Sequence, residues 1–208
     1  MNWHPTYHVH PAIAYSRSVV ESMPRRTGRS MEEWVELASL NGPDGEKPCR
    51  DWLRTEYGLG GTTAAGVASF LHGDGRLKMD EGHYLASAPE MVDSMYGGKK
   101  AHLRAIHDRV IRLAVKLGDD VRISPTKTTV PLYRQNVFAN LKPSTLSRVD
   151  LGLCIRQGPI PDGSDRIIDT GGAGKGDRIT CRIPLTSEED VDDFVATWLG
   201  RAYQEDQL

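Results

Sequence analysis

Residues 147–155, SRVDLGLCI, decide the fold of the C-terminal half of the chain. Val149, Leu151 and Leu153 alternate with polar or small residues, which is the period-two pattern of a strand with one buried face. Similar stretches occupy 121–123, 128–133, 136–141 and 178–183. Short polar turns separate most of them, and Pro184 follows the last one. The pattern predicts an antiparallel β-meander.

Helical patterns lie on both sides of these strands. Before them, apolar residues at spacings of three and four predict the core face of an amphipathic helix that stops at Gly118: Leu103, Ile106, Val110, Leu113 and Leu117. After them, Thr186 or Ser187 can cap a last helix that carries acidic residues in its first turn. We therefore predict an α+β fold in which an N-terminal and a C-terminal helix pack on one side of an antiparallel meander.

The first third of the chain has no strand pattern. Residues 12–73 predict a small bundle of short helices, of which the first ends near Pro24. Ser30 and Glu33 form a capping-box pattern ahead of an apolar series. The predicted organisation is an N-terminal extension at 1–11, a helical domain at 12–73, a linker at 74–88 and an α+β domain at 89–208.

The most specific local signal is a pattern of glycines between two predicted helices. It follows the order of a helix-hairpin-helix element, with Gly58, Leu59, Gly60, Thr63, Ala64 and Val67. Glycines let such a turn approach a phosphate closely, and the amides of the next helix then point at the anion. Contacts of this kind go to the nucleic-acid backbone and carry little sequence preference. An ordinary tight turn between packed helices is the alternative interpretation.

Charge is unevenly distributed along a chain whose net charge is −2. Residues 99–156 hold 12 Lys and Arg against 4 Asp and Glu, a net charge of +8. This segment could form a basic face for an anionic ligand or nucleic acid, or it could be neutralised by the acidic flanks. With the turn, it predicts these ligand-binding residues: Gly58, Gly60, Gly61, Thr62, Lys127, Tyr133, Arg134, Arg148 and Lys175.

Residues 170–177, TGGAGKGD, resemble a phosphate-binding loop only superficially. Asp169 stands where a P-loop needs its first glycine, and Gly176 stands where it needs Ser or Thr. We interpret the segment as a flexible turn or flap. In a second hypothesis the loop 158–177 closes a small-molecule pocket on the sheet, which Tyr133, Arg134, Arg148 and Lys175 would face.

Recognisable catalytic, metal and membrane motifs are absent from the sequence. We expect no metal site at His4, His8 and His10, no cofactor, and no catalytic dyad at His107 and Asp108, because adjacent residues should point apart on a helix. Three widely spaced cysteines predict free thiols in a reducing compartment. With no membrane span and no signal peptide, the sequence predicts a cytoplasmic protein.

The chain resembles a family of uncharacterised bacterial proteins built from two domains of unknown function. The N-terminal likeness rests on 27–34, Trp52-Leu53 and 57–60, and the C-terminal likeness on Phe138-Ala139, 148–153 and 180–183, together with Trp198-Leu199. The C-terminal domain is also distantly similar to the frataxin-like bacterial domain. The resemblance implies fold more than function, although relatives occur beside restriction-type proteins, which favours nucleic acid.

Three hypotheses follow for the function. The first is non-catalytic binding of an anionic partner, in particular a nucleic-acid backbone, by the hairpin turn and a basic sheet face. The second is an enzyme or small-molecule-binding protein with a pocket beneath the loop 158–177. The third is iron handling by exposed carboxylates of the last helix that have no basic partners: Glu188, Glu189, Asp192 and Asp193.

Overall fold

The computed structural model describes residues 5–160 and 165–207. The chain forms two compact units, one of residues Val9–Ser87 and one that joins Met1–His8 to Ala88–Leu208. The first unit is helical and the second is α+β, which confirms the predicted fold class. Each unit has a hydrophobic core of its own.

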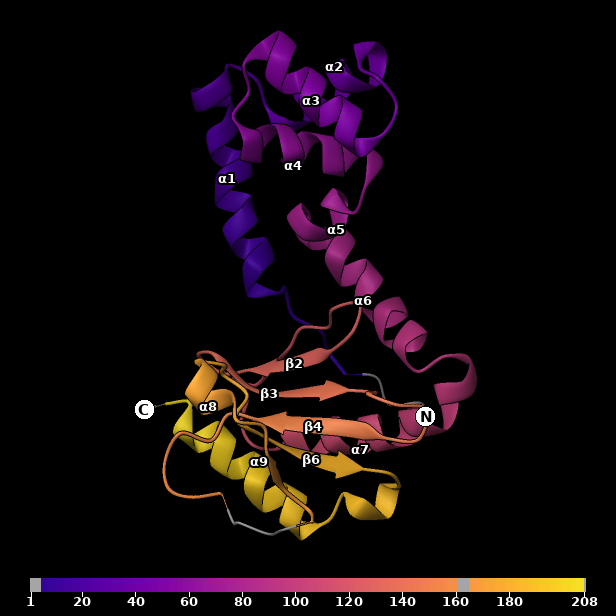
Figure 1. Cartoon of the computed structure of the whole chain (residues 1–208), viewed down its shortest axis with the longest axis vertical. Coiled ribbons are helices and arrows are strands. Elements are labelled where there is room, and N and C mark those ends of the chain that lie inside the picture. The colour runs from indigo at the N-terminus through magenta and orange to yellow at the C-terminus, as the bar shows by residue number, and fades with distance from the viewer. Residues whose placement is uncertain (1–4, 161–164, 208) are drawn as a thin grey trace. The chain divides into compact units, whose positions relative to one another are not determined.

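Short helices build the helical unit (Figure 1). They are α1 (Pro11–Thr27), α2 (Met31–Asn41), α3 (Glu46–Tyr57), α4 (Gly61–His72), α5 (Gly75–Met79) and the start of α6 (Glu81–Met95). The predicted capping box is confirmed at α2, where Ser30 Oγ accepts the Glu33 N–H at 3.2 Å and Glu33 Oε2 accepts the Ser30 N–H at 2.7 Å. Buried apolar side chains from α2, α3 and α4, including Trp34, Leu53 and Val67, form the core.

The structure adds to or corrects the sequence-based prediction at two places in this half of the chain. Pro24 does not end the first helix, which continues to Thr27 and closes at Gly28 with a left-handed φ of 79°. Proline lacks the N–H that would bond to the carbonyl of Val20, so α1 continues past Pro24 with one backbone hydrogen bond missing. The segment 74–88, predicted as a linker, is helical, because α5 and the first half of α6 occupy it. Its scattered glycines obscure the helical pattern in the sequence.

The α+β unit has a single described sheet, preceded by η1 (Gly98–Leu103) and α7 (Arg104–Ala114). Its strands are β1 (Arg122–Ile123), β2 (Val130–Tyr133), β3 (Val137–Lys142), β4 (Val149–Leu153), β5 (Ile168–Asp169) and β6 (Cys181–Leu185). They lie in the order β1-β2-β3-β4-β6-β5, and each neighbouring pair is antiparallel (Figure 1). The first four strands therefore form the predicted meander.

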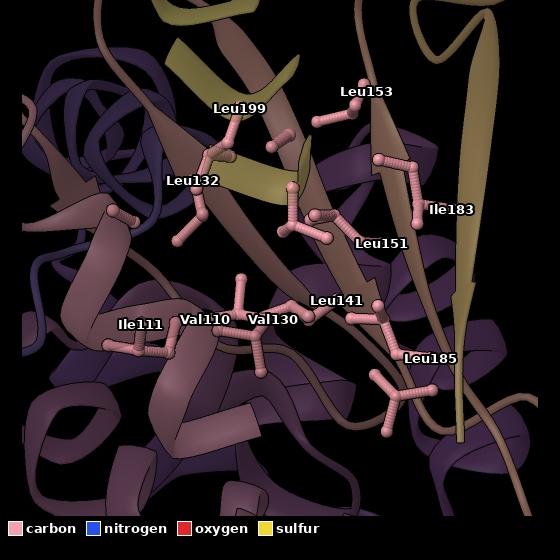
Figure 2. Packing of buried hydrophobic residues seen from close by; sticks show 14 of the residues in the cluster. Val110, Ile111, Val130, Leu132, Leu141, Leu151, Leu153, Ile183, Leu185 and Leu199 are labelled. Atoms are coloured by element: carbon pink, nitrogen blue, oxygen red, sulfur yellow. The ribbon is translucent and has the colours of Figure 1, made fainter. Parts of the chain in front are cut away.

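The register places the alternating apolar residues of the strands on one face. Leu141 lies opposite Leu151, and Leu151 lies opposite Ile183. Figure 2 shows these side chains together with Ile111 of α7 and Leu199 of α9 (Asp193–Glu205), all in one buried cluster. Because α7 and α9 also contact each other, the two helices cover the same face of the sheet.

The region around the glycine-rich segment differs from its prediction. β5 pairs with β6 in the stretch predicted as a flap, and a short helix, α8 (Gly172–Lys175), follows it. Pro184 lies inside β6 and does not end the strand. Among the described strands, β5 pairs with β6 only at Cys181 and Arg182, so Pro184 sits on an open edge, where a strand tolerates proline.

The last helix begins later than the capping pattern suggests. Ser187 forms its capping box with Asp190 around a short 3₁₀ helix, η2 (Glu188–Asp190). Asp192 is the N-cap of α9, and its Oδ1 accepts the N–H groups of Phe194 and Val195. The run of acidic residues therefore serves two successive helix starts.

Candidate functional site

The turn between α3 and α4 exposes the amino end of a helix. α3 ends at Gly58, whose φ of 65° is left-handed and whose N–H donates to Arg54 O at 3.2 Å. Leu59 then turns its side chain into the core. Gly60 is the N-cap of α4 and has no side chain to cap it, and Ala64 is the first residue whose N–H bonds back, to Gly60 O at 2.9 Å. The preceding amides therefore remain available at the positive end of the helix dipole.

Neither packing nor backbone conformation requires glycine at positions 60 and 61. Gly60 has a φ of −59°, which any residue can adopt, and Gly61 is the first residue of α4. An added Cβ at either position would meet no described heavy atom within 4 Å. Glycine at a helical position such as Gly61 costs stability relative to alanine, whereas an N-cap position such as Gly60 favours glycine over alanine. The two glycines leave the backbone open to close approach from outside the molecule.

Basic side chains follow one face of α3 toward this turn. Lys47, Arg50 and Arg54 are spaced by three and four residues, which places them on the same side of the helix. Asp51 lies among them and pairs with Arg50 at 2.8 Å. The hydrogen bond from Arg50 lowers the pKa of Asp51, and the charges of Lys47 and Arg54 lower it further. This face of α3 thus carries three basic side chains and one acidic one, although the helix as a whole holds three residues of each sign.

A depression lies beside the turn on the same face. It has a volume of about 450 Å³ and is lined by Asp51, Arg54, Thr55 and Leu59. Tyr57, which directly precedes the turn, is 39% exposed. The turn thus combines free helix amides, a basic flank and a partly exposed aromatic ring, which are the groups that bind a phosphate chain.

The sheet residues predicted as ligand contacts have different surroundings. Arg134 is engaged inside the α+β unit, where its Nε donates to Asp120 Oδ2 at 2.7 Å and its Nη1 donates to Tyr203 O at 3.2 Å. Its side chain is only 11% exposed. Tyr133 lies opposite Arg122 of β1, and burial raises the pKa of its hydroxyl. Internal pairing therefore accounts for the charge of Arg134.

Arg148 and the two predicted lysines complete this set. Arg148 Nε lies 2.9 Å from Asp150 Oδ1, and Arg182 Nη1 lies 3.0 Å from the same oxygen. Lys127 is exposed ahead of β2, and Lys175 is exposed at the end of α8. The predicted residues divide between the units, with the four turn residues in the helical unit and the other five in the α+β unit.

Comparison with known families matches both units. A family model described as "Domain of unknown function (DUF5655)" matches residues 92–206, more than half of the chain. The chain belongs to the DUF5655 family. A second model, "Domain of unknown function (DUF4287)", matches residues 16–71, which include α3, α4 and their turn. No curated protein and no solved structure matches the chain.

A buried polar cluster in the DUF5655 domain corrects one expectation. His107 and Asp108 do not point apart, because His107 Nδ1 lies 3.0 Å from Asp108 Oδ1. His107 is 1% exposed, and burial lowers the pKa of its imidazole. Its ring packs at a tilt against the ring of Tyr96, with the two centroids 4.9 Å apart, and burial raises the pKa of the Tyr96 hydroxyl. Arg104, in the first turn of α7, donates from Nε to Asp108 Oδ1 at 2.9 Å. This hydrogen bond holds the Asp108 carboxylate beside His107.

The described residues also bear on metal binding and on insertion into a membrane. Within residues 5–160 and 165–207, no group of three or more His, Cys, Asp or Glu side chains is placed to hold a metal ion. His4 lies outside these residues, so the predicted absence of a site there stays a prediction. No helix in the described ranges is long and apolar enough to cross a membrane.

Several residues of the turn site escaped the sequence reasoning. Lys47, Arg50 and Arg54 flank the turn. The prediction instead placed basic ligand contacts in residues 99–156, whose net charge is +8. The spacing of Lys47, Arg50 and Arg54 by three and four residues ahead of Gly58 is the signal that identifies them. The net charge of the whole helical unit does not reveal this basic face of α3. The sum also includes acidic residues on other helices, which outweigh the three basic residues.

Proposed function

We propose that the chain binds the phosphate backbone of nucleic acid through the α3–α4 turn, without reading base sequence. The observation that carries the proposal is the pair Gly60 and Gly61, which neither backbone conformation nor packing requires to be glycine. An approaching phosphate needs that open backbone, because a Cβ would hold it away from the helix amides.

The turn offers several donors to one phosphate and its neighbours. The amides of Gly61, Thr62 and Thr63 begin α4, and the exposed side chain of Thr62 adds a hydroxyl. Arg54 stands one turn before Gly58 and would contact the next phosphate along the strand. None of these groups selects a base, so the binding would be general for sequence and dependent on salt.

The basic sheet face contributes less to this proposal than the turn does. Arg134 and Arg148 already pair with Asp120 and Asp150. A guanidinium held by a carboxylate neutralises less of an approaching phosphate than one that is unpaired. We therefore place the contact on the helical unit.

The test is a titration of labelled single- and double-stranded DNA and RNA, followed by fluorescence anisotropy at about 50 and 200 mM salt. We expect binding at the lower salt that falls steeply at the higher. Gly61→Ala should weaken it by about fivefold or more, the equivalent of about 1 kcal/mol, by placing a methyl group between phosphate and amides. Arg54→Gln should weaken binding and make it less sensitive to salt.

Gly174→Ala in α8 is the matched control. An added Cβ there also meets open space, and the residue lies outside the turn. It should leave affinity unchanged. Absence of binding to all four nucleic acids at low salt would sink the proposal, since electrostatic affinity is greatest there. Equal losses in Gly61→Ala and Gly174→Ala would remove the turn from it.

Iron handling, suggested by the distant similarity to the frataxin-like domain, has less support. That function needs grouped carboxylates without basic partners. Arg166 instead donates to both carboxylate oxygens of Asp192 at 2.9 Å, and Asp190 Oδ2 accepts from the backbone of Thr186 and Ser187. Titration of the protein with ferrous iron, followed by calorimetry, would revive this alternative if it gave saturable binding that Asp193→Asn abolished.

A further inference from the structure

A pocket opens in the α+β unit between the end of β4 and the chain that follows α8. Its volume is about 380 Å³. Cys154, Ile155 and Arg156 form one wall, and Ala173, Asp177 and Arg178 belong to the other. The second hypothesis from the sequence placed a pocket in this region, but with Tyr133, Arg134, Arg148 and Lys175 as its lining; none of these four lines this one.

Arg178 lines the pocket and forms a long ion pair with the buried Asp206, without a hydrogen bond between them. Its Nη1 lies 3.5 Å from Asp206 Oδ1, whose side chain is 0% exposed. Neither atom makes a hydrogen bond within the described chain. The other Asp206 oxygen is fixed, because Oδ2 accepts the Asn136 N–H at 2.8 Å. The buried carboxylate thus holds the guanidinium in place electrostatically through the buried Nη1, and the Arg178 side chain, which is 35% exposed, offers its other N–H groups to the pocket.

Arg156 supplies the second cation from the opposite wall. Its backbone N–H donates to Glu205 Oε2 at 2.6 Å, and the N–H of Gln157 donates to the same oxygen at 3.1 Å. Arg201 binds the other oxygen of Glu205 at 2.7 Å. The main chain at residue 156 is therefore anchored, while its side chain is exposed and enters none of the ion pairs of the described residues.

The rest of the lining is largely apolar, and hydrogen bonds join two of its residues. Thr180 Oγ1 accepts the Ile155 N–H at 3.0 Å and donates to Ile155 O at 2.9 Å, so the hydroxyl locks the two walls together. Cys154 and Ile155 are largely buried, and they make that wall of the pocket, hereafter its apolar floor, hydrophobic. The lining holds two guanidinium groups and one carboxylate, that of Asp177, and Asp206 lies behind Arg178 outside the lining.

We propose that this pocket binds a small organic anion through Arg156 and Arg178. Guanidinium groups match the planar geometry of a carboxylate and the oxygens of a phosphate, and both anions are bound by paired arginines in proteins. The apolar floor would hold a short carbon chain or ring attached to the anionic group. Asp206 acts through Arg178 and is a positioning residue. The inference is independent of nucleic-acid binding, because it uses different residues in the other unit.

The test uses the ¹⁵N-labelled full chain, titrated separately with inorganic phosphate and with acetate, and followed by NMR. We expect saturable shifts of the amides of Arg156, Gly176 and Arg178 with at least one anion, and the tighter of the two identifies the preferred head group. Arg156→Gln should weaken binding about tenfold, the equivalent of one charge-assisted hydrogen bond of about 1.4 kcal/mol. Its exposed side chain makes this variant safe for folding.

Lys175→Gln is the matched control, because it removes the same charge from the neighbouring α8 without touching the lining. It should bind with unchanged affinity. Arg178→Gln should also lose binding, and its unfolding midpoint shows whether the loss reflects the fold. The proposal is overturned if neither anion gives saturable shifts at these amides, or if Lys175→Gln weakens binding as much as Arg156→Gln does.

Discussion

Arg134 lies over the ring of Tyr203, with its guanidinium carbon 4.0 Å from the ring centroid. Asp120 joins the two, because Oδ1 accepts the Tyr203 hydroxyl at 2.6 Å and Oδ2 accepts Arg134 Nε at 2.7 Å. Three side chains distant in sequence thus tie the end of β2 to α9. Arg134, which belongs to the basic segment 99–156, therefore makes contacts within the DUF5655 domain.

Removing this contact should destabilise the α+β unit. Arg134→Gln should lower the free energy of unfolding by about 1–3 kcal/mol, since a mostly buried cation–π contact and a charged hydrogen bond are lost. Urea unfolding followed by circular dichroism measures the change. Arg109→Gln, at an exposed position of α7, should change stability by no more than about 0.5 kcal/mol. Equal unfolding midpoints for the two variants would show that the contact is not stabilising.

The same contact shows why sequence reasoning is stronger on elements than on surfaces. Alternation at Val149, Leu151 and Leu153 predicts β4 because period two has one structural meaning. The partners of Arg134 cannot be found in this way, since Asp120 is 14 positions away and Tyr203 is 69. A pairing between distant residues depends on how the elements pack, which one sequence does not contain.

Short and irregular features were missed for a related reason. β5 has two residues, too few to show a period, and it is placed only by its pairing with β6. The turn at Gly58 was predictable, because its left-handed backbone favours glycine and leaves a local signature. The basic flank of that turn and the pocket at Arg156 and Arg178 each depend on which side chains share a face after folding.

Glu205 should make the stability of the α+β unit depend on pH in the acid range. Burial raises its pKa, but the N–H groups of Arg156 and Gln157 and the guanidinium of Arg201 outweigh burial and lower it below the ordinary 4.5. A lowered folded pKa gives stability that is complete above pH 4.5 and is lost as the pH falls through the folded value.

The variant Glu205→Gln tests this dependence. It should lower the free energy of unfolding at neutral pH by about 1–3 kcal/mol, because charged hydrogen bonds become neutral ones. The difference from the parent chain should shrink as the pH falls below the ordinary pKa. Urea unfolding midpoints of the variant and the parent chain, measured across the acid range, test this prediction. A difference between the two midpoints that stays constant with pH would contradict it.

His107 should make the stability of the α+β unit depend on pH in a higher range than Glu205 does. Burial lowers the pKa of its imidazole below 6.5, and this effect exceeds the opposing hydrogen bond to Asp108. Between the folded pKa and 6.5 the unfolded chain binds a proton that the folded chain does not, so stability falls as the pH drops through this window. His107→Asn keeps a donor for Asp108 and should flatten the profile there. The exposed His102→Asn should not, and identical profiles for both variants would exclude His107 as the cause.

Gly75 and Gly61 should respond oppositely to the same substitution. A Cβ at Gly75 would lie 2.6 Å from Phe70 Cα and 2.6 Å from the Ser69 carbonyl carbon, and backbone atoms cannot move aside cheaply. Gly75→Ala should therefore cost about 1–3 kcal/mol. Gly61→Ala meets open space at a helix start and should be neutral, or stabilising by up to about 1 kcal/mol.

Urea unfolding of both alanine variants measures this contrast, and its outcome bears directly on the turn site. If Gly61→Ala is at least as stable as the parent chain, its loss of nucleic-acid affinity cannot come from a damaged fold and must come from the added methyl group at the turn. If Gly61→Ala is destabilised as much as Gly75→Ala, internal structure does require glycine at that position. The reason for placing a phosphate against the start of α4 would then be gone.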